Sequence, residues 1–168
     1  SDKTIPSLRR IADTLKANGN KAILQIHHAG RMSPPQELPD GQPISASAIA
    51  AERPDAATPR EMTESEILET IKAYGEAARR AIIAGFDGVE IHGANTYLIQ
   101  QFFSPHSNRR TDKWGGSLEK RMTFPLAIAD EVIAIVKQHA DRPFIVGYRI
   151  SPEEMENPGI TLNDTLQL

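Results

Sequence analysis

Apolar residues recur along this chain in blocks with two different spacings. Between residues 5 and 18 they fall at helical intervals, and Gly19 follows as a helix stop. Residues 21–27 then form a short apolar run that ends in polar side chains, a pattern typical of a buried parallel strand that leads into a loop. The chain is therefore expected to open with a helix and a strand.

The middle of the chain repeats this order of helix and strand. Thr63 and Glu66 form a capping box, in which the hydroxyl and the carboxylate each accept a hydrogen bond from a free amide at a helix start. The helix is expected to run to about Ala84, where Gly85 ends it. A second apolar run predicts a strand over residues 87–92.

The last third of the chain contains the third repeat. It predicts a helix that ends near His139, with Pro125 marking a kink or a restart inside it. A third apolar run predicts a strand over residues 144–150. Another helix then opens, with Asn163 or Thr161 as its N-cap.

Two long segments, residues 29–60 and 93–116, have no sustained period and are expected to be loops, the first with one short turn of helix at most. Both follow strands, whereas the returns from helix to strand are short. This asymmetry is typical of a (β/α)₈ TIM barrel, in which the loops after the strands build the active site. A doubly wound open sheet alternates in the same way, but no glycine-rich phosphate loop follows any strand here.

Three strands are too few for a complete barrel, which needs eight strands and about 250 residues. The chain begins and ends in a helix. We therefore expect residues 1–168 to be a single incomplete barrel segment, with about strands three to five of a longer polypeptide.

Composition excludes several classes of function. Of the 168 residues 39% are hydrophobic, enough for one substantial core, and the net charge is only -3. No basic run is interleaved with aromatic residues, and no apolar stretch approaches the roughly 20 residues that span a bilayer, so neither nucleic acid nor membrane is expected as a partner. The polar N-terminus lacks a signal-peptide pattern, which favours the cytoplasm. The absence of Cys excludes disulfides, thiol nucleophiles and Cys-ligated metals within this segment.

The candidate chemistry is concentrated after the second strand, in the sequence HGANTY. His92 and Asn95 offer two hydrogen-bond donors that can converge on one carbonyl oxygen, which would polarise it and stabilise an enolate-like transition state. Tyr97 supplies a separate phenolic acid. The alternatives are a structural histidine at a strand end and a packed tyrosine whose hydroxyl bonds elsewhere.

Two further polar residues lie within or at the end of apolar strands. Gln25 offers both a donor and an acceptor to a ligand, or makes a structural hydrogen bond to a neighbouring strand. Arg149 is costly to bury without an anionic partner. That partner is either a carboxylate such as Glu90 or an anionic ligand.

Two clusters invite other interpretations. His27 and His28 suggest a metal site, but adjacent residues of a strand face opposite sides and do not readily bind one ion together. The cationic segment RRTDKWGGSLEKR suggests a nucleic-acid or phosphate site. Asp112 and Glu119 offset its charge, which favours a solvated or hydrogen-bonded loop anchor.

Several motifs together resemble one family. In order, they are LQIHHAGR, PREMTESEI, ARRAIIAGFDGVEIHGANTYLIQQFFSPHSNRRTDKWGGSLEKR and VGYRISP. This series resembles the Old Yellow Enzyme family of NADH:flavin oxidoreductases, which are FMN-dependent ene-reductases, over most of the chain. The resemblance implies a parent flavoprotein that binds FMN at the C-terminal mouth of a TIM barrel. Such an oxidoreductase takes hydride from NAD(P)H and passes it to a small-molecule substrate with an activated alkene, an α,β-unsaturated carbonyl compound.

The resemblance also assigns roles to individual residues. Gln25 is similar to the glutamine on the flavin pyrimidine edge, and Arg149 to the arginine that stabilises reduced flavin. His92 and Asn95 are similar to the pair that holds the substrate carbonyl. Tyr97 is similar to the acid that protonates the substrate carbon next to that carbonyl. Many relatives have a second His in place of Asn95, so substrate preference cannot be transferred from either branch.

Some properties stay open at this point. The family's first-strand flavin contacts and its phosphate-binding loops fall outside these residues, and so would the Cys ligands of the iron–sulfur cluster that some relatives carry. The natural substrate, the choice of NADH or NADPH and the formation of a homo-oligomer are likewise open. The alternative function is a non-catalytic remnant that keeps the barrel signals without bound flavin.

Overall fold

A computed structural model describes all 168 residues of the chain. A three-stranded parallel sheet, in the order β1-β4-β5, forms its centre. The strands of this sheet are β1 (Ile23–Ile26), β4 (Gly88–Gly93) and β5 (Ile145–Ile150). The helices are α1 (Ile5–Lys16), α2 (Glu64–Ala84), α3 (Leu98–Phe103), α4 (Leu118–His139) and α5 (Leu162–Gln167), with three short 3₁₀ turns, η1 (Asp2–Thr4), η2 (Gly30–Met32) and η3 (Pro35–Glu37).

The three predicted strands all occur, and each end lies within two residues of the predicted one. The caps at its two ends explain why helix α2 lies where it was expected. The Thr63 hydroxyl accepts a hydrogen bond from the Glu66 amide while the Glu66 carboxylate accepts one from the Thr63 amide, and Gly85 ends α2 in a left-handed conformation with φ of 93°. Thr161, and not Asn163, caps α5.

The two expected loops contain more structure than the single short turn of helix that the sequence indicated for the first of them. The first holds the turns η2 and η3 and the short parallel pair β2 (Ile44–Ser45) and β3 (Arg60–Glu61). The second holds α3, all six residues of which are buried. Helix α4 continues through the buried Pro125 without a restart, because packing of this segment holds it against α2 and α3.

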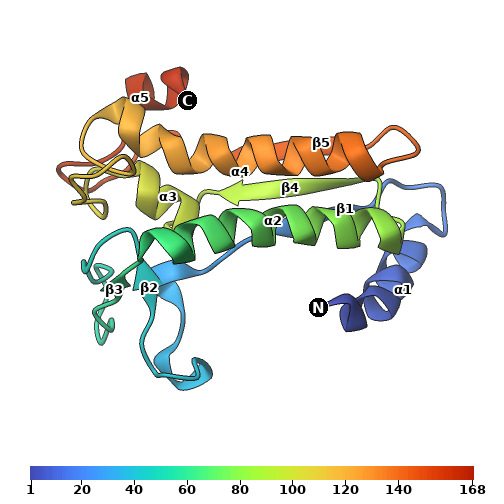
Figure 1. The fold of residues 1–168 in the computed structure, drawn as a ribbon, viewed down its shortest axis with the longest axis horizontal. Coiled ribbons are helices and arrows are strands. Elements are labelled where there is room, and N and C mark those ends of the chain that lie inside the picture. The colour runs from blue at the N-terminus through green and yellow to red at the C-terminus, as the bar shows by residue number, and fades with distance from the viewer.

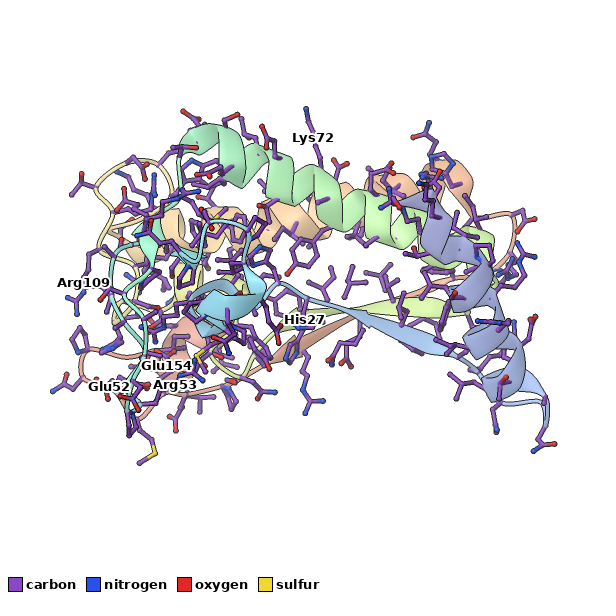
Figure 2. All side chains as sticks on the ribbon, turned by 90° about the horizontal axis from the view of Figure 1, so that it is seen from below. His27, Glu52, Arg53, Lys72, Arg109 and Glu154 are labelled. Carbon is purple, nitrogen blue, oxygen red and sulfur yellow. The ribbon has the colours of Figure 1, made fainter.

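Helices α2 and α4 cover one side of the central sheet, and the two views of the molecule agree on this arrangement (Figures 1 and 2). The core lies between these helices and the sheet. Side chains of the strands that face it are Leu24, Ile26, Val89, Ile91 and Val146. The opposite side of the sheet is open, and so are the outer edges of β1 and β5.

The open edges predict how the isolated chain behaves. Ile23 on β1 and Ile145 on β5 are 39% and 54% exposed, and each belongs to a strand with an unpaired edge. We expect the 168-residue chain on its own to self-associate, because exposed apolar edge strands pair with other chains. Sedimentation velocity over a concentration series measures this. The double variant Ile23→Lys, Ile145→Lys should associate less, and a wild-type chain that stays monomeric throughout would refute the prediction.

None of the helices is both long and apolar enough to cross a bilayer.

Candidate active site

The candidate site lies on the open face of the sheet, at the carboxyl ends of its strands. Strand geometry explains the placement, since alternate residues of a strand point to opposite faces. Gln25 of β1 pairs with Glu90 of β4, and His92 of β4 pairs with Arg149 of β5. The apolar strand residues, such as Val89, point to the helices. Because the four polar residues alternate with them along the strands, their side chains share the opposite, open face.

Gln25 and Arg149 differ in how their polar groups are used within the chain. The Gln25 amide donates one hydrogen bond to the Glu90 carboxylate and leaves its carbonyl oxygen unused. Arg149 is exposed and forms neither a hydrogen bond nor an ion pair. The predicted alternative, an ion pair between Arg149 and Glu90, is therefore absent. A free guanidinium and an amide with a free acceptor can bind a ligand that combines negative charge with donor groups.

His92 is the next-to-last residue of β4, and the rings of His27 and Tyr97 pack against its side chain. The residue is 3% exposed, and its ring nitrogen Nδ1 is buried without a hydrogen-bond partner. Burial, together with the charges of His27 and Arg149, lowers the pKa of His92 below its ordinary value near 6.5. The ring is therefore neutral at pH 7 and carries one N–H donor, as a group that polarises a carbonyl oxygen requires.

Asn95 and Thr96 form a tight turn directly after β4. Both have positive φ values, 56° and 61°, in the left-handed region. The Asn95 amide donates to Ser151 Oγ at 3.1 Å, and the Tyr97 amide donates to the Ala94 carbonyl at 3.2 Å. The Asn95 side chain is exposed and forms no hydrogen bond within the chain, so its amide is free to bind a ligand.

Tyr97 returns toward the sheet and meets two histidine rings. Its ring centroid lies 5.1 Å from that of His92 and 5.1 Å from that of His27. The two histidine rings are 6.0 Å apart at 80° to each other. The structure thus brings two of the three predicted catalytic side chains into one cluster on the open face.

His27 is the member of this cluster that sequence reasoning missed as a partner of His92 and Tyr97. It lies two residues beyond Gln25, directly after β1, and the alternation of the strand continued by one residue could have identified it. The adjacent His28 turns away, and its Nδ1 accepts a hydrogen bond from the Gly30 amide at 3.0 Å. No group of three His, Asp or Glu side chains gathers as a metal site anywhere in the chain.

The buried arginines of the two loops, Arg31 and Arg110, are anchors. The buried Arg31 donates to the carbonyls of Ile49 and Ala50, and neither it nor the exposed Arg109 joins the histidine cluster. Figure 2 shows Arg109 well apart from His27. Arg110, from the cationic segment, is buried and binds Asp112, which agrees with the predicted loop anchor.

The largest pocket, about 380 Å³, lies elsewhere, between the edge of β1 and helix α2. Its wall includes Ile26 and Tyr74 from the core side of the sheet, and of the site residues it touches only His27 and its neighbour His28. Since this pocket lies at an open edge and carries none of the other site residues, the polar open face is the better candidate.

Comparison with known proteins gives consistent matches over the whole chain. The family model described as NADH:flavin oxidoreductase / NADH oxidase family matches residues 1–168. The chain is 59% identical over 168 residues to the NADH:acrylate oxidoreductase of Vibrio harveyi, covering 100% of this chain and 17% of that protein. It is 52% identical over 167 residues to the probable NADH-dependent flavin oxidoreductase YqiG of Bacillus subtilis (strain 168), covering 99% of this chain and 44% of that protein.

Solved structures give the same result. Morphinone reductase in complex with tetrahydroNAD superposes with a TM-score of 0.80 at 36% identity, over 90% of this chain and 45% of that chain. A 2-naphthoyl-CoA reductase complex superposes with a TM-score of 0.91 at 31% identity, over 99% of this chain and 26% of that chain. The chain thus spans less than half the length of these relatives. The matches confirm the prediction that the α/β arrangement is part of a (β/α)₈ barrel.

Proposed function

Because the chain belongs to the NADH:flavin oxidoreductase / NADH oxidase family, we propose that it forms the FMN-facing and substrate-facing centre of a longer NAD(P)H-dependent oxidoreductase. We further propose that the complete protein reduces α,β-unsaturated carbonyl compounds. The observation that carries this proposal is the open polar face of the sheet, where Gln25, His92 and Arg149 lie on three neighbouring strands.

FMN fits the donor set at the sheet. Arg149 is an unpaired cation, suited to the negative charge of a reduced flavin, and Gln25 has a free amide acceptor for a ring N–H. When bound, FMN would supply the hydride transfer between NAD(P)H and the substrate. Residues 1–168 supply only part of a barrel mouth, so we expect the isolated chain to bind FMN poorly.

The substrate would bind over the histidine cluster. His92, neutral at pH 7, would donate to the substrate carbonyl oxygen, and the free amide of Asn95 would supply the second donor. Tyr97, whose ring contacts His92, would protonate the carbon next to that carbonyl. The substrate class agrees with the name of the NADH:acrylate oxidoreductase, although this chain covers only 17% of that protein.

Three broader features belong to the same proposal. The segment would occupy about strands three to five of the complete barrel, with a small molecule as its substrate and neither nucleic acid nor membrane as a partner. We propose the cytoplasm as its location, where NAD(P)H is available.

An absorbance spectrum of the complete protein tests the function against its alternative. Purified protein with a flavin spectrum that NAD(P)H bleaches and an enone restores would support the oxidoreductase. A folded complete protein that neither retains nor takes up FMN would instead support the non-catalytic remnant.

Loss of Arg149 should weaken FMN binding. The Arg149→Ala variant of the complete protein should lose about 1.5 to 3 kcal/mol of affinity, the typical contribution of a hydrogen bond to a charged group. Fluorescence titration of the apoprotein with FMN measures this, with Arg10→Ala on α1 as a control that removes an exposed guanidinium far from the sheet end. Equal affinity and an equal flavin reduction potential in both variants would contradict the role of Arg149.

Loss of His92 should weaken substrate binding and spare the flavin. His92→Ala should lower the affinity for phenolic or enone ligands by about 1 to 3 kcal/mol, since a buried hydrogen-bond donor is removed. Ligand-induced changes in the flavin spectrum give the dissociation constant. The exposed His139→Ala, at the end of α4, serves as the control. Unchanged ligand affinity in His92→Ala would remove this residue from the substrate site.

A further inference from the structure

The turn between β4 and α3 has a backbone conformation that its residues do not favour. Asn95 and Thr96 are both left-handed, with φ of 56° and 61°. Asparagine tolerates this region, but for a β-branched residue such as threonine it is a clear outlier. Such a turn persists only where the surrounding structure holds it.

Two consecutive glutamines of α3 hold both backbone polar groups of Thr96. The Thr96 amide donates to Gln100 Oε1 at 2.9 Å, and the Thr96 carbonyl accepts from Gln101 Nε2 at 2.6 Å. The two glutamines are only 3% and 1% exposed. Their buried side-chain amides thus both bond Thr96, the residue between Asn95 and Tyr97.

Gln101 connects this turn to the loop after β1. Besides the Thr96 carbonyl, its Nε2 contacts the Ala29 carbonyl at 3.1 Å. Its Oε1 accepts from the Arg31 amide at 3.0 Å and from Ser45 Oγ at 2.9 Å. All four hydrogen-bonding positions of this amide are therefore used, and they fix the turn relative to the loop after β1, the loop that begins with His27.

Gln100 connects the same turn to the loop after β5. Its Nε2 donates to Glu154 Oε1 at 2.6 Å. The other carboxylate oxygen of Glu154 accepts from Ser104 Oγ and from the Ile160 amide. Figure 2 shows Glu154 at the end of the molecule where the loops gather. The turn is thereby tied to the loops after all three strands of the sheet.

We propose that Gln100 and Gln101 are positioning residues, which keep Thr96 left-handed and so direct Asn95 and Tyr97 toward the space above His92. This inference rests on the proposed function, because it concerns the orientation of the two side chains, Asn95 and Tyr97, that are proposed to contact the substrate. Packing alone does not require these amides, since apolar side chains of similar volume would fill the same buried space. The amides instead satisfy the Thr96 amide and carbonyl, which no regular hydrogen bond of α3 or β4 pairs.

The test compares Gln100→Met and Gln101→Met in the complete, FMN-loaded protein. Both keep the side-chain length and remove the amide. We expect flavin reduction by NAD(P)H to stay near the wild-type rate. Reoxidation by an enone should slow about 10-fold or more, since a misplacement of 1 Å can cost on the order of 100-fold. Gln138→Met, at an exposed position of α4, is the matched control and should leave both rates unchanged.

A rescue separates positioning from general support of the fold. Glycine adopts positive φ without a Cβ penalty, so Thr96→Gly should restore most of the lost reoxidation rate in the Gln100→Met background. Wild-type reoxidation in Gln100→Met, equal slowing of both half-reactions, or failure of the glycine to restore the rate would each overturn the proposal. If Gln101→Met does not fold, Gln100→Met, which leaves the bonds of Gln101 intact, decides the question.

Hydrogen exchange tests the positioning role independently of the proposed function, because it needs no enzyme activity. Measured by mass spectrometry on a peptide that contains residues 94–98, exchange should be faster in Gln100→Met than in wild type and should not change in Gln138→Met. Unchanged exchange in this peptide overturns the positioning role of Gln100 even where the enzyme is active. Wild-type protein that an enone cannot reoxidise refutes the proposed function, and faster exchange in Gln100→Met would then still support the positioning role.

Discussion

Replacing Tyr97 by phenylalanine in the complete protein should slow reoxidation by an enone about 100- to 10,000-fold, the range that a positioned general acid contributes. The phenol would deliver its proton to the substrate, and that proton is needed only in this half of the cycle. Reduction by NAD(P)H should therefore proceed at nearly the original rate. The ring contacts with His27 and His92 do not involve the hydroxyl group, so phenylalanine should keep the packing of the cluster.

Stopped-flow absorbance of the flavin measures the two half-reactions separately. Tyr74→Phe is the matched control, because Tyr74 lies in the core on the opposite side of the sheet. It should leave both rates unchanged. Slower flavin reduction in Tyr97→Phe with normal enone turnover would show instead that Tyr97 packs near the nicotinamide.

The sequence predicted those parts of the fold that depend on local patterns. The three strands are short apolar runs, and the ends of α2 follow from the hydrogen bonds of Thr63 and the left-handed Gly85. These patterns involve residues close in sequence, so they can be recognised without knowledge of the tertiary structure. Helix α3 was missed because it has only six residues and no side-chain N-cap bond.

The candidate site was predicted only in part, because some of its contacts join residues that are far apart in the sequence. His92, Asn95 and Tyr97 lie within six residues, and their types alone suggest carbonyl chemistry. The contact between His27 and Tyr97 joins two loops that are 70 residues apart, and only the pairing of β1 with β4 creates it. The buried bonds of Gln100 and Gln101 were invisible because glutamine in a presumed loop carries no periodic signal.

Arg110 was predicted as a loop anchor, and its contacts indicate how much stability it contributes. Its side chain is only 6% exposed. One amino group donates to the carbonyls of Ala46 and Met62 at 3.1 and 2.8 Å, while the rest of the guanidinium binds the Asp112 carboxylate at distances down to 2.6 Å. It therefore joins the loop that follows β4 to both ends of the β2–β3 segment.

Replacing Arg110 by methionine should destabilise the complete protein by about 2 to 4 kcal/mol, because it leaves the buried carbonyls of Ala46 and Met62 without their donor. Urea unfolding followed by circular dichroism measures the change. The neighbouring Arg109→Met is the matched control. Arg109 is exposed and its side chain donates only to the His106 carbonyl, so its loss should cost less than about 1 kcal/mol. Arg110→Lys should fall between the two, since lysine keeps the charge but cannot bond both carbonyls and Asp112 with one planar fork. Equal stability of Arg110→Met and Arg109→Met would mean that water replaces the guanidinium at these carbonyls.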